Sequence, residues 1–488
     1  MKTACCILAF LSLAVGIPRG LAASLNDRVG SFVRAPRFEG ASWGVKVVAV
    51  KSGAILAGHR TSSRMNPASN AKLFTGALVL DRFGPEHRFV TRFYSHVKAD
   101  EGGVLKGDLI VQGGGDFSMA ARFHGGDYKA AVGRLVTAVK AAGIRKIEGE
   151  VLADDTLYTR SGPGLGWDWD DLHYYYGAPA SALMLEDNTV DLKILPGKEI
   201  GQPCVVEPLP GWGMLHPVNR IVTGAKGEKG RIEISRGLGQ SLVEMEGMLG
   251  LAGSGTTEAV SVPDGSVHFL KLFEAALAKA GISFKRGPVV PRLARRVEMS
   301  RGLKLLAEVE GAPIRETLPV MMQRSNNLYA QMMFLNVGAF SELPREGGDS
   351  TEDLSKAELE AFLKRAGIQA GSVYLHEGSG LSRGDLLSAD SVCDLLLHMT
   401  AHPQAKPFRE SLPVAGRSGT LEGRFKGTFA EGNLRAKTGT LRFVHALSGY
   451  ATRANGDEVV FSILLNHHRV PSSEARGEID ALVRMILE

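Results

Sequence analysis

A short polar stretch that runs directly into an apolar one places the strongest constraint on how this chain can fold. Residues 66–72 hold a proline, a serine and a lysine just before a run of mostly apolar residues. Asn66 is a good helix N-cap and Pro67 suits the first helical position, so we predict a buried helix that begins here. Ser69 then lies in the first turn, where backbone N–H groups lack partners, and Lys72 follows on the same face. A serine hydroxyl beside a lysine amine is a candidate nucleophile, although alone the pattern also fits a capped core helix with a solvated lysine.

Length and composition indicate a multidomain globular protein. The 488 residues are too many for one ordinary core, so two or three domains are expected. Hydrophobic residues make up 44% of the chain and charged residues 22%, which argues against disorder. The formal net charge of +5 is small for this length and no basic block is visible, so we expect no nucleic acid partner.

The N-terminus has the pattern of a secretory signal peptide. Lys2 supplies a positive start, residues 4–17 form an apolar core, and residues 20–23 offer small side chains for cleavage. We therefore predict a signal peptide over residues 1–23 and a mature chain in the periplasm without a stable transmembrane anchor. The alternative is a membrane anchor, although the apolar core is short for a span.

The cysteines do not form a disulfide framework. Cys5 and Cys6 lie within the predicted signal peptide, which leaves Cys204 and Cys393 in the mature chain. The sequence does not decide whether these two form a bond. With two cysteines and no H-E-x-x-H motif, a zinc enzyme is unsupported, and we expect neither a metal nor a cofactor.

Three short patterns occur in a fixed order along the chain, and together they are far harder to obtain by chance than any one alone. They are Ser69-x-x-Lys72, Ser325-x-Asn327 and Lys437-Thr438-Gly439. The corresponding set S-x-x-K, S-D-N and K-T-G marks penicillin-binding proteins and β-lactamases. We expect Ser325 inside a continuous helical segment over residues 313–337, and Lys437 at the end of a strand over residues 434–437.

The first of these residues supply the parts that acyl transfer needs. Ser69 would attack a carbonyl group. Lys72 would act as its base after losing a proton, which burial and the nearby cation Lys437 would promote. Ser325 could pass a proton to the leaving amine, and Asn327 could hold the substrate amide.

The strand residues would hold the rest of the substrate. Lys437 and Thr438 could bind a terminal carboxylate, and Gly439 would let the substrate lie close to the strand edge. The backbone N–H groups of Ser69 and Thr440 would form an oxyanion hole.

A second serine gives an alternative interpretation. Residues 380–384 match the G-x-S-x-G elbow of α/β-hydrolases, with Ser382 as nucleophile and Asp457 and His467 to complete a triad. The elbow needs a strand that runs straight into a helix at the serine. Here the next predicted helix begins several residues later, near Ala389.

Over nearly all of the mature chain, the sequence resembles the low-molecular-mass class C penicillin-binding proteins, the D-alanyl-D-alanine carboxypeptidase/endopeptidase family. Besides the three motifs, the likeness includes residues 109–116, 153–155, 166–171, 177–179 and 377–383. The last stretch usually begins with aspartate in this family, so Glu377 is a mild departure. The resemblance also identifies the G-x-S-x-G match as part of a structural loop.

The resemblance implies an α/β fold: a penicillin-binding, serine β-lactamase-like transpeptidase domain with two nested, mainly β inserted domains. The catalytic domain would comprise residues 24–92 and 290–488, and the inserted region residues 93–289. The long separation of Ser69 and Ser325 fits such an insertion, which β-lactamases lack. The nesting follows from the resemblance and not from periodicity.

The resemblance also implies the activity. The protein would cleave after D-alanine in peptidoglycan stem peptides through an acyl-enzyme on Ser69, and could also cut D-alanyl cross-links as an endopeptidase. β-Lactam antibiotics would be covalent inhibitors. Two alternatives stay open: a β-lactamase on the same fold, and a catalytically inactive cell-wall binding protein.

In this family a pocket beside the nucleophile binds the third residue of the stem peptide, often diaminopimelate. The resemblance places Asp171 against the amine of that residue, Tyr176 against its methylenes and Arg424 against its carboxylate, for which a guanidinium fork is well shaped. The family often has phenylalanine where Tyr176 stands, and Asp171 and Arg424 could equally be ordinary surface charges.

Overall fold

The computed structural model describes residues 23–160, 162–285, 302–344 and 348–488. The predicted signal peptide therefore lies almost entirely outside the described residues. Within those ranges, no helix combines the length and the apolar character needed to cross a membrane. Cys204 and Cys393 are both buried free thiols, so they do not form a disulfide.

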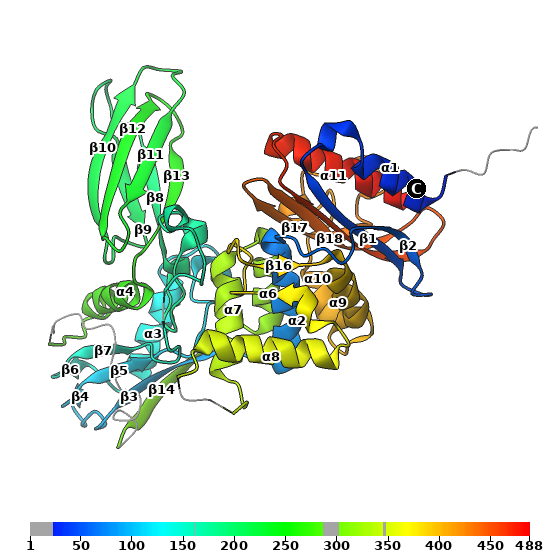
Figure 1. Cartoon of the computed structure of the whole chain (residues 1–488). Helices are drawn as coiled ribbons and strands as arrows, with labels where there is room; N and C mark the ends of the chain where they lie inside the picture. The colour runs from blue at the N-terminus through cyan, green and yellow to red at the C-terminus, as the bar shows by residue number, and fades with distance from the viewer. Residues whose placement is uncertain (1–22, 161, 286–301, 345–347) are drawn as a thin grey trace, which may run out of the picture.

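One antiparallel sheet joins the two ends of the chain (Figure 1). Its strand order is β17-β18-β19-β1-β2. The strands are β1 (Ser42–Ala49), β2 (Ile55–His59), β17 (Arg435–Leu441), β18 (Val444–Thr452) and β19 (Glu458–Asn466). Because β1 pairs with β19 along its whole length, the N-terminal and C-terminal parts of the sequence meet inside one sheet.

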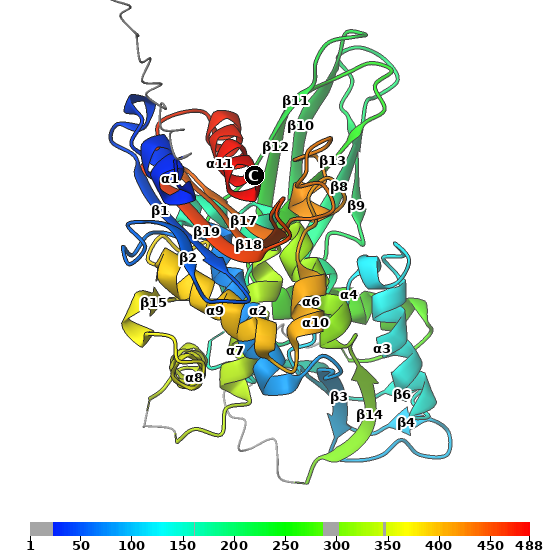
Figure 2. The same cartoon turned by 90° about the vertical axis from the view of Figure 1, so that its right-hand side faces the viewer.

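Helices cover both faces of this sheet, as Figures 1 and 2 show from two sides. On one face lie α1 (Leu25–Val33) and α11 (Ser472–Leu487), which also contact each other. On the other face, α9 (Ala389–Ala401) contacts β1, β18 and β19. The remaining helices of this layer are α2 (Ala71–Phe83), α6 (Ile314–Arg324), α7 (Asn327–Ala339), α8 (Thr351–Arg365) and α10 (Ala405–Ser411).

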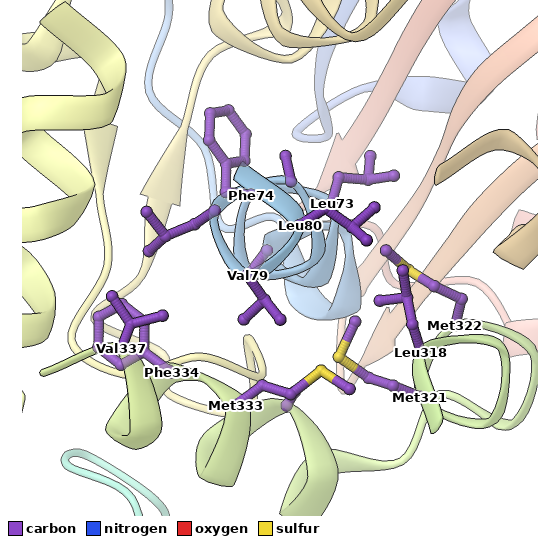
Figure 3. Packing of buried hydrophobic residues seen from close by; sticks show 14 of the residues in the cluster. Leu73, Phe74, Val79, Leu80, Leu318, Met321, Met322, Met333, Phe334 and Val337 are labelled. Carbon is purple, nitrogen blue, oxygen red and sulfur yellow. The ribbon is translucent and has the colours of Figure 1, made fainter. Parts of the chain in front are cut away.

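Helix α2 is the centre of the helical layer. Every residue from Ala71 to Leu80 is buried, as expected for a helix that is apolar on nearly all sides. Figure 3 shows Val79 of α2 pointing towards Met333 of α7, while Phe74 points to the opposite side of the helix. Lys72 is a charged residue within this buried helix, and such a group needs hydrogen-bond partners.

The prediction of one continuous helix over residues 313–337 is wrong at Ser325. The segment forms two helices, α6 and α7, which separate at Ser325, where the backbone is left-handed with a φ of 56°. The side chain of Asn326 then caps α7 by accepting the Tyr329 N–H. Apolar residues resume at Leu328, seven positions after Met321, so the helical phase is kept across the polar run and the break is hidden. The polar Ser325–Asn326 pair ends one helix and starts the next.

Two smaller differences also lie at the motifs. Before α2, residues Ala68–Asn70 form a 3-10 turn, and the Asn66 side chain accepts the Ala68 N–H at 3.0 Å. Lys437 lies inside β17 and not at a strand end, because β17 continues to Leu441 opposite β18. Because the residues after Lys437 are the polar run Thr-Gly-Thr, the prediction from apolar residues placed the end of this strand too early.

The chain between α2 and α6 forms several further sheets (Figure 1). One sheet contains β3 (Val90–Ser95), β5 (Leu109–Gln112), β7 (Val151–Asp154) and β14 (Lys304–Glu310), and a short pair contains β4 (Val104–Leu105) and β6 (Lys146–Ile147). The helices packed with them are α3 (Ala130–Ala141) and α4 (Gly265–Lys279). Two three-stranded sheets share another core, β8 (Thr189–Leu195), β9 (Val205–Leu209) and β13 (Thr256–Ser261), and β10 (His216–Gly224), β11 (Arg231–Arg236) and β12 (Leu242–Gly250).

These separate sheets agree with the α/β class and with inserted, mainly β units. The division into residues 24–92, 93–289 and 290–488 stays a prediction. Strand β14 of the last segment pairs with β3, so one sheet takes strands from both sides of the predicted insertion.

Candidate active site

Ser69 and Lys72 lie in direct contact at the start of α2. The Lys72 Nζ donates a hydrogen bond to the Ser69 Oγ at 3.0 Å. Ser69 lines a cleft of about 1800 Å³, whereas Lys72 is wholly buried behind it. A hydroxyl that faces the cleft is thus backed by an amine that water does not reach.

The surroundings of Lys72 favour loss of its proton. Its Nζ lies 2.7 Å from the Asn327 Oδ1 and 2.7 Å from the Ser379 carbonyl oxygen. Burial lowers the pKa of Lys72 to about 7, although the charges of Glu377 and Asp385 act in the opposite direction. A large share of these amines is therefore neutral near pH 7, as a general base requires.

Ser325, which lines the cleft, and the wholly buried Lys437 form a second hydroxyl–amine pair. The Lys437 Nζ donates to the Ser325 Oγ at 2.9 Å and to the Thr438 carbonyl at 2.8 Å. Burial, and then the charge of Lys72, lower the pKa of Lys437 well below its usual value. The left-handed turn at Ser325 ends α6 at this position, so the break in the helix is also where the side chain meets Lys437.

Asn327 is fixed from both ends of its amide. Its Oδ1 accepts from Lys72, and its Nδ2 donates to the backbone carbonyl of Tyr176 at 3.0 Å. The inserted region therefore contributes a backbone group to the centre of the site. Sequence patterns could not reveal this contact, because a carbonyl carries no residue signature.

Strand β17 runs close beside the nucleophile. A Cβ at Gly439 would lie 2.6 Å from the Pro67 carbonyl oxygen and 3.1 Å from the Cβ of Ala68. Glycine is therefore needed here for the close approach of β17 to the turn that carries Ser69. Thr440 lines the cleft, and the Thr438 Oγ1 donates to the Thr420 Oγ1 at 2.8 Å. Thr420 is a cleft residue that the sequence patterns missed.

The three predicted pocket residues do not all lie together. Asp171 and Tyr176 line the cleft, and the Tyr176 hydroxyl donates to the Asp171 Oδ1 at 3.1 Å. Burial raises the pKa of Asp171, although the hydrogen bond from Tyr176 acts in the opposite direction. Arg424 instead forms an ion pair with Asp480 of α11, and it is not among the cleft-lining residues. The arginines that do line the cleft are Arg122, Arg324, Arg383 and Arg442.

The alternative triad is not assembled. Ser382 is wholly buried, and its Oγ lies 3.3 Å from the Nδ1 of His376. Asp457 bonds Asn455 in the hairpin between β18 and β19, and His467 lies beside Ser42. The G-x-S-x-G match is therefore a structural loop and not a nucleophile elbow.

Comparison with known proteins places this geometry in a family. The family model of the D-Ala-D-Ala carboxypeptidase 3 (S13) family matches residues 25–486. The D-alanyl-D-alanine carboxypeptidase of Actinomadura sp. (strain R39) is 33% identical over 463 residues, which cover 92% of this chain and 82% of that protein.

Solved structures agree in fold. Penicillin binding protein 4 (dacB) from Haemophilus influenzae has a TM-score of 0.78 at 24% identity, covering 94% of this chain and 98% of that chain. Its complex with a novel β-lactam has a TM-score of 0.71 at 23% identity, with the same coverage. The expected penicillin-binding fold and the resemblance are thus confirmed. The chain belongs to the D-Ala-D-Ala carboxypeptidase 3 (S13) family.

Proposed function

We propose that this protein is a serine D-alanyl-D-alanine carboxypeptidase that acts on peptidoglycan stem peptides through an acyl-enzyme on Ser69. Family membership and the names of the relatives support the reaction. A related structure is a complex with a β-lactam, which supports the binding of β-lactams to this protein. The observation that carries the proposal is the buried Lys72 amine, which lies 3.0 Å from the Ser69 hydroxyl.

The residues suggest an order of events. Neutral Lys72 accepts the proton of Ser69 as the Ser69 Oγ attacks the carbonyl carbon of the penultimate D-alanine. The backbone N–H groups of Ser69 and Thr440 stabilise the oxyanion. The proton taken up by Lys72 then passes through the Ser325 hydroxyl, which Lys437 holds, to the nitrogen of the leaving D-alanine. Water later attacks the acyl group, giving one proton to Lys72, which returns it to the Ser69 oxygen as the bond to the acyl group breaks. Asn327 would hold the substrate amide, and Thr438 with Lys437 would attract the terminal carboxylate.

Labelling with a fluorescent penicillin tests this proposal. The purified protein should retain the label, and Ser69→Ala should lose both the label and the release of D-alanine while remaining folded. Ser382→Ala is the matched control, because it changes the serine of the excluded elbow and should still be labelled. Rapid loss of label would favour a β-lactamase, and absence of label would favour an inactive cell-wall binding protein.

We further propose that the inserted region recognises the third residue of the stem peptide. Asp171 would bind its amine and Tyr176 would pack on its methylenes, since both line the cleft. Arg424 could bind its carboxylate only by exchanging its ion pair with Asp480. The same open cleft would admit a cross-linked peptide, which is the basis for an added endopeptidase activity.

We also propose that the protein is exported to the periplasm. The relatives named as D-alanyl-D-alanine carboxypeptidases support a place at the cell wall. Mass spectrometry of the protein from a periplasmic fraction should find a mature chain that begins after Ala22 or Ala23. Recovery of the uncut chain in membranes would instead favour the anchor.

A further inference from the structure

A buried carboxylate organises the loop that lies behind Lys72. Glu377 is wholly buried. Its Oε2 accepts the Ser379 N–H at 2.6 Å. Its Oε1 accepts from the Ser379 Oγ at 3.0 Å and from the N–H groups of Gly380, Leu381 and Ser382 at 2.7, 3.0 and 3.3 Å. These donors all point at one side chain, as expected around an ionised carboxylate.

The loop held by Glu377 presents its carbonyl groups to α2. The Ser379 carbonyl accepts from the Lys72 Nζ at 2.7 Å, and the Gly378 carbonyl accepts from the Thr75 Oγ1 at 2.6 Å. The loop also presses against the nucleophile turn, because a Cβ at Gly380, where φ is +80°, would lie 1.9 Å from the Ala68 carbonyl oxygen. The position of the Lys72 amine thus depends on the shape of this loop.

A second buried acid, Asp385, lies within hydrogen-bond reach of the Glu377 side chain. The Asp385 Oδ1 accepts the His376 N–H at 2.7 Å, whereas its Oδ2 is buried and has no donor among the described residues. Burial, and next the charge of Glu377, raise the pKa of Asp385 well above its usual value. Two buried carboxyl groups in contact share one proton more readily than they carry two charges. The titratable groups next to these two acids are Lys72, on whose charge both act, and His376, whose backbone N–H bonds Asp385.

We propose that Glu377 and Asp385 are positioning residues that act as one acid–carboxylate pair, in which Asp385 keeps its proton and donates it to ionised Glu377. The pair holds the Ser379 carbonyl in hydrogen-bond contact with the Lys72 amine. It also places one negative charge, and not two, near that amine. This inference rests on the proposed role of Lys72 as the base for Ser69. It also assigns a role to the Glu377 departure from the aspartate that is usual in the resembled family.

The test is the pH dependence of acylation by benzylpenicillin in single-residue variants of the full mature chain. Glu377→Gln removes the charge and places an amide among N–H donors. The lower pH limb of acylation should then move down by at least about one pH unit, and the maximal rate should fall. Glu377→Asp keeps the charge, so its limb should stay near that of the wild type even if the rate falls.

Asp385→Asn is the decisive variant because it is isosteric and its amide can donate to Glu377 as a protonated acid does. We expect the midpoint of the limb to stay where it is in the wild type. A downward shift in Asp385→Asn would show that Asp385 carries the charge, and would overturn the pair. This variant decides the question even if Glu377→Gln does not fold.

Failure of this inference can be told apart from failure of the proposed function. If penicillin does not label Ser69 in the wild type, the proposed function is wrong, whereas a labelled wild type without a limb near pH 7 would show only that Lys72 is not the base. If that limb is present but Glu377→Gln leaves its midpoint unchanged, only the acid–carboxylate pair is overturned.

Discussion

Lys72 carries an amine in a place that water does not reach. Its three partners are the Ser69 hydroxyl, the Asn327 side-chain oxygen and the Ser379 carbonyl. None of them is an anion, so the hydrogen bonds position the amine without fully compensating for the burial of its charge. The residue is thus held ready as a base at a pH where a solvated lysine would be protonated.

The pH dependence of acylation should report this residue directly. Since Lys72 has a pKa of about 7, the neutral amine gains population as the pH rises, and acylation by benzylpenicillin should rise through a limb near pH 7. Lys72→Arg should reduce acylation by at least about a hundredfold, because a guanidinium group stays protonated. The measurement is the stopped-flow acylation rate over roughly pH 5 to 8, the range in which proteins are usually most stable. Near-normal acylation in the arginine variant would exclude Lys72 as the base.

At the scale of elements, the site depends on how ends and edges meet. The 3-10 turn before α2 supplies Ser69, the break between α6 and α7 supplies Ser325 and Asn327, and β17 supplies Lys437. Edge strand β17 approaches the nucleophile turn so closely that only glycine fits at residue 439. The geometry of the nucleophile is therefore sensitive to a single methyl group on a neighbouring strand.

Gly439→Ala tests that contact. The added Cβ would meet the Pro67 carbonyl oxygen at 2.6 Å, so β17 must move away from Ser69. We expect acylation by benzylpenicillin to fall by at least about tenfold while circular dichroism shows a folded protein, since small displacements of reacting groups are costly. Gly133→Ala in α3 is the control, because its Cβ would meet nothing within 4 Å and alanine favours a helix. Equal acylation in both variants would contradict this view of β17.

At the scale of the whole molecule, the inserted region supplies groups that hold the residues of the candidate active site. The Tyr176 carbonyl holds the Asn327 amide. Asp187 accepts a hydrogen bond from the Tyr329 hydroxyl of α7 at 2.8 Å and pairs with Arg122. These bonds join the insertion to the segment that carries Ser325 and Asn327. A change in the insertion can therefore alter both substrate binding and catalysis.

Asp171→Ala tests the recognition of the stem peptide by the insertion. A charge-assisted hydrogen bond in a partly buried cleft contributes on the order of 1.5–3 kcal/mol to binding. Its loss should lower kcat/KM on diaminopimelate-containing peptides by roughly tenfold or more. Acylation by benzylpenicillin, which lacks that side chain, should barely change.

The control for this prediction is Glu101→Ala, which removes an exposed carboxylate of the inserted region that is not among the cleft-lining residues. Its effect on peptide cleavage should be much smaller. Equal losses on the peptide and on benzylpenicillin in Asp171→Ala would remove the third-residue pocket from the proposed function.

The sequence by itself determined the chemical parts and most of the elements. Ser69 and Lys72 lie within one helical turn, and Lys437 to Gly439 are contiguous, so local spacing predicts their association. The strands β1, β18 and β19 and the helices α2 and α9 follow from apolar periodicity, which acts over short distances. The inserted arrangement came from resemblance, and its exact limits stay a prediction.

Only the tertiary structure decided which of these residues contact one another and how those contacts change their chemistry. The depressed pKa of Lys72 requires burial against α7 and the loop that carries Ser379, and the orientation of Asn327 requires a carbonyl of the insertion. The break at Ser325 is invisible to apolar spacing, and the ion pair of Arg424 with Asp480 joins segments that no local pattern connects. Burial, charge and hydrogen-bond geometry are set by neighbours in space, and these neighbours lie far apart in the sequence.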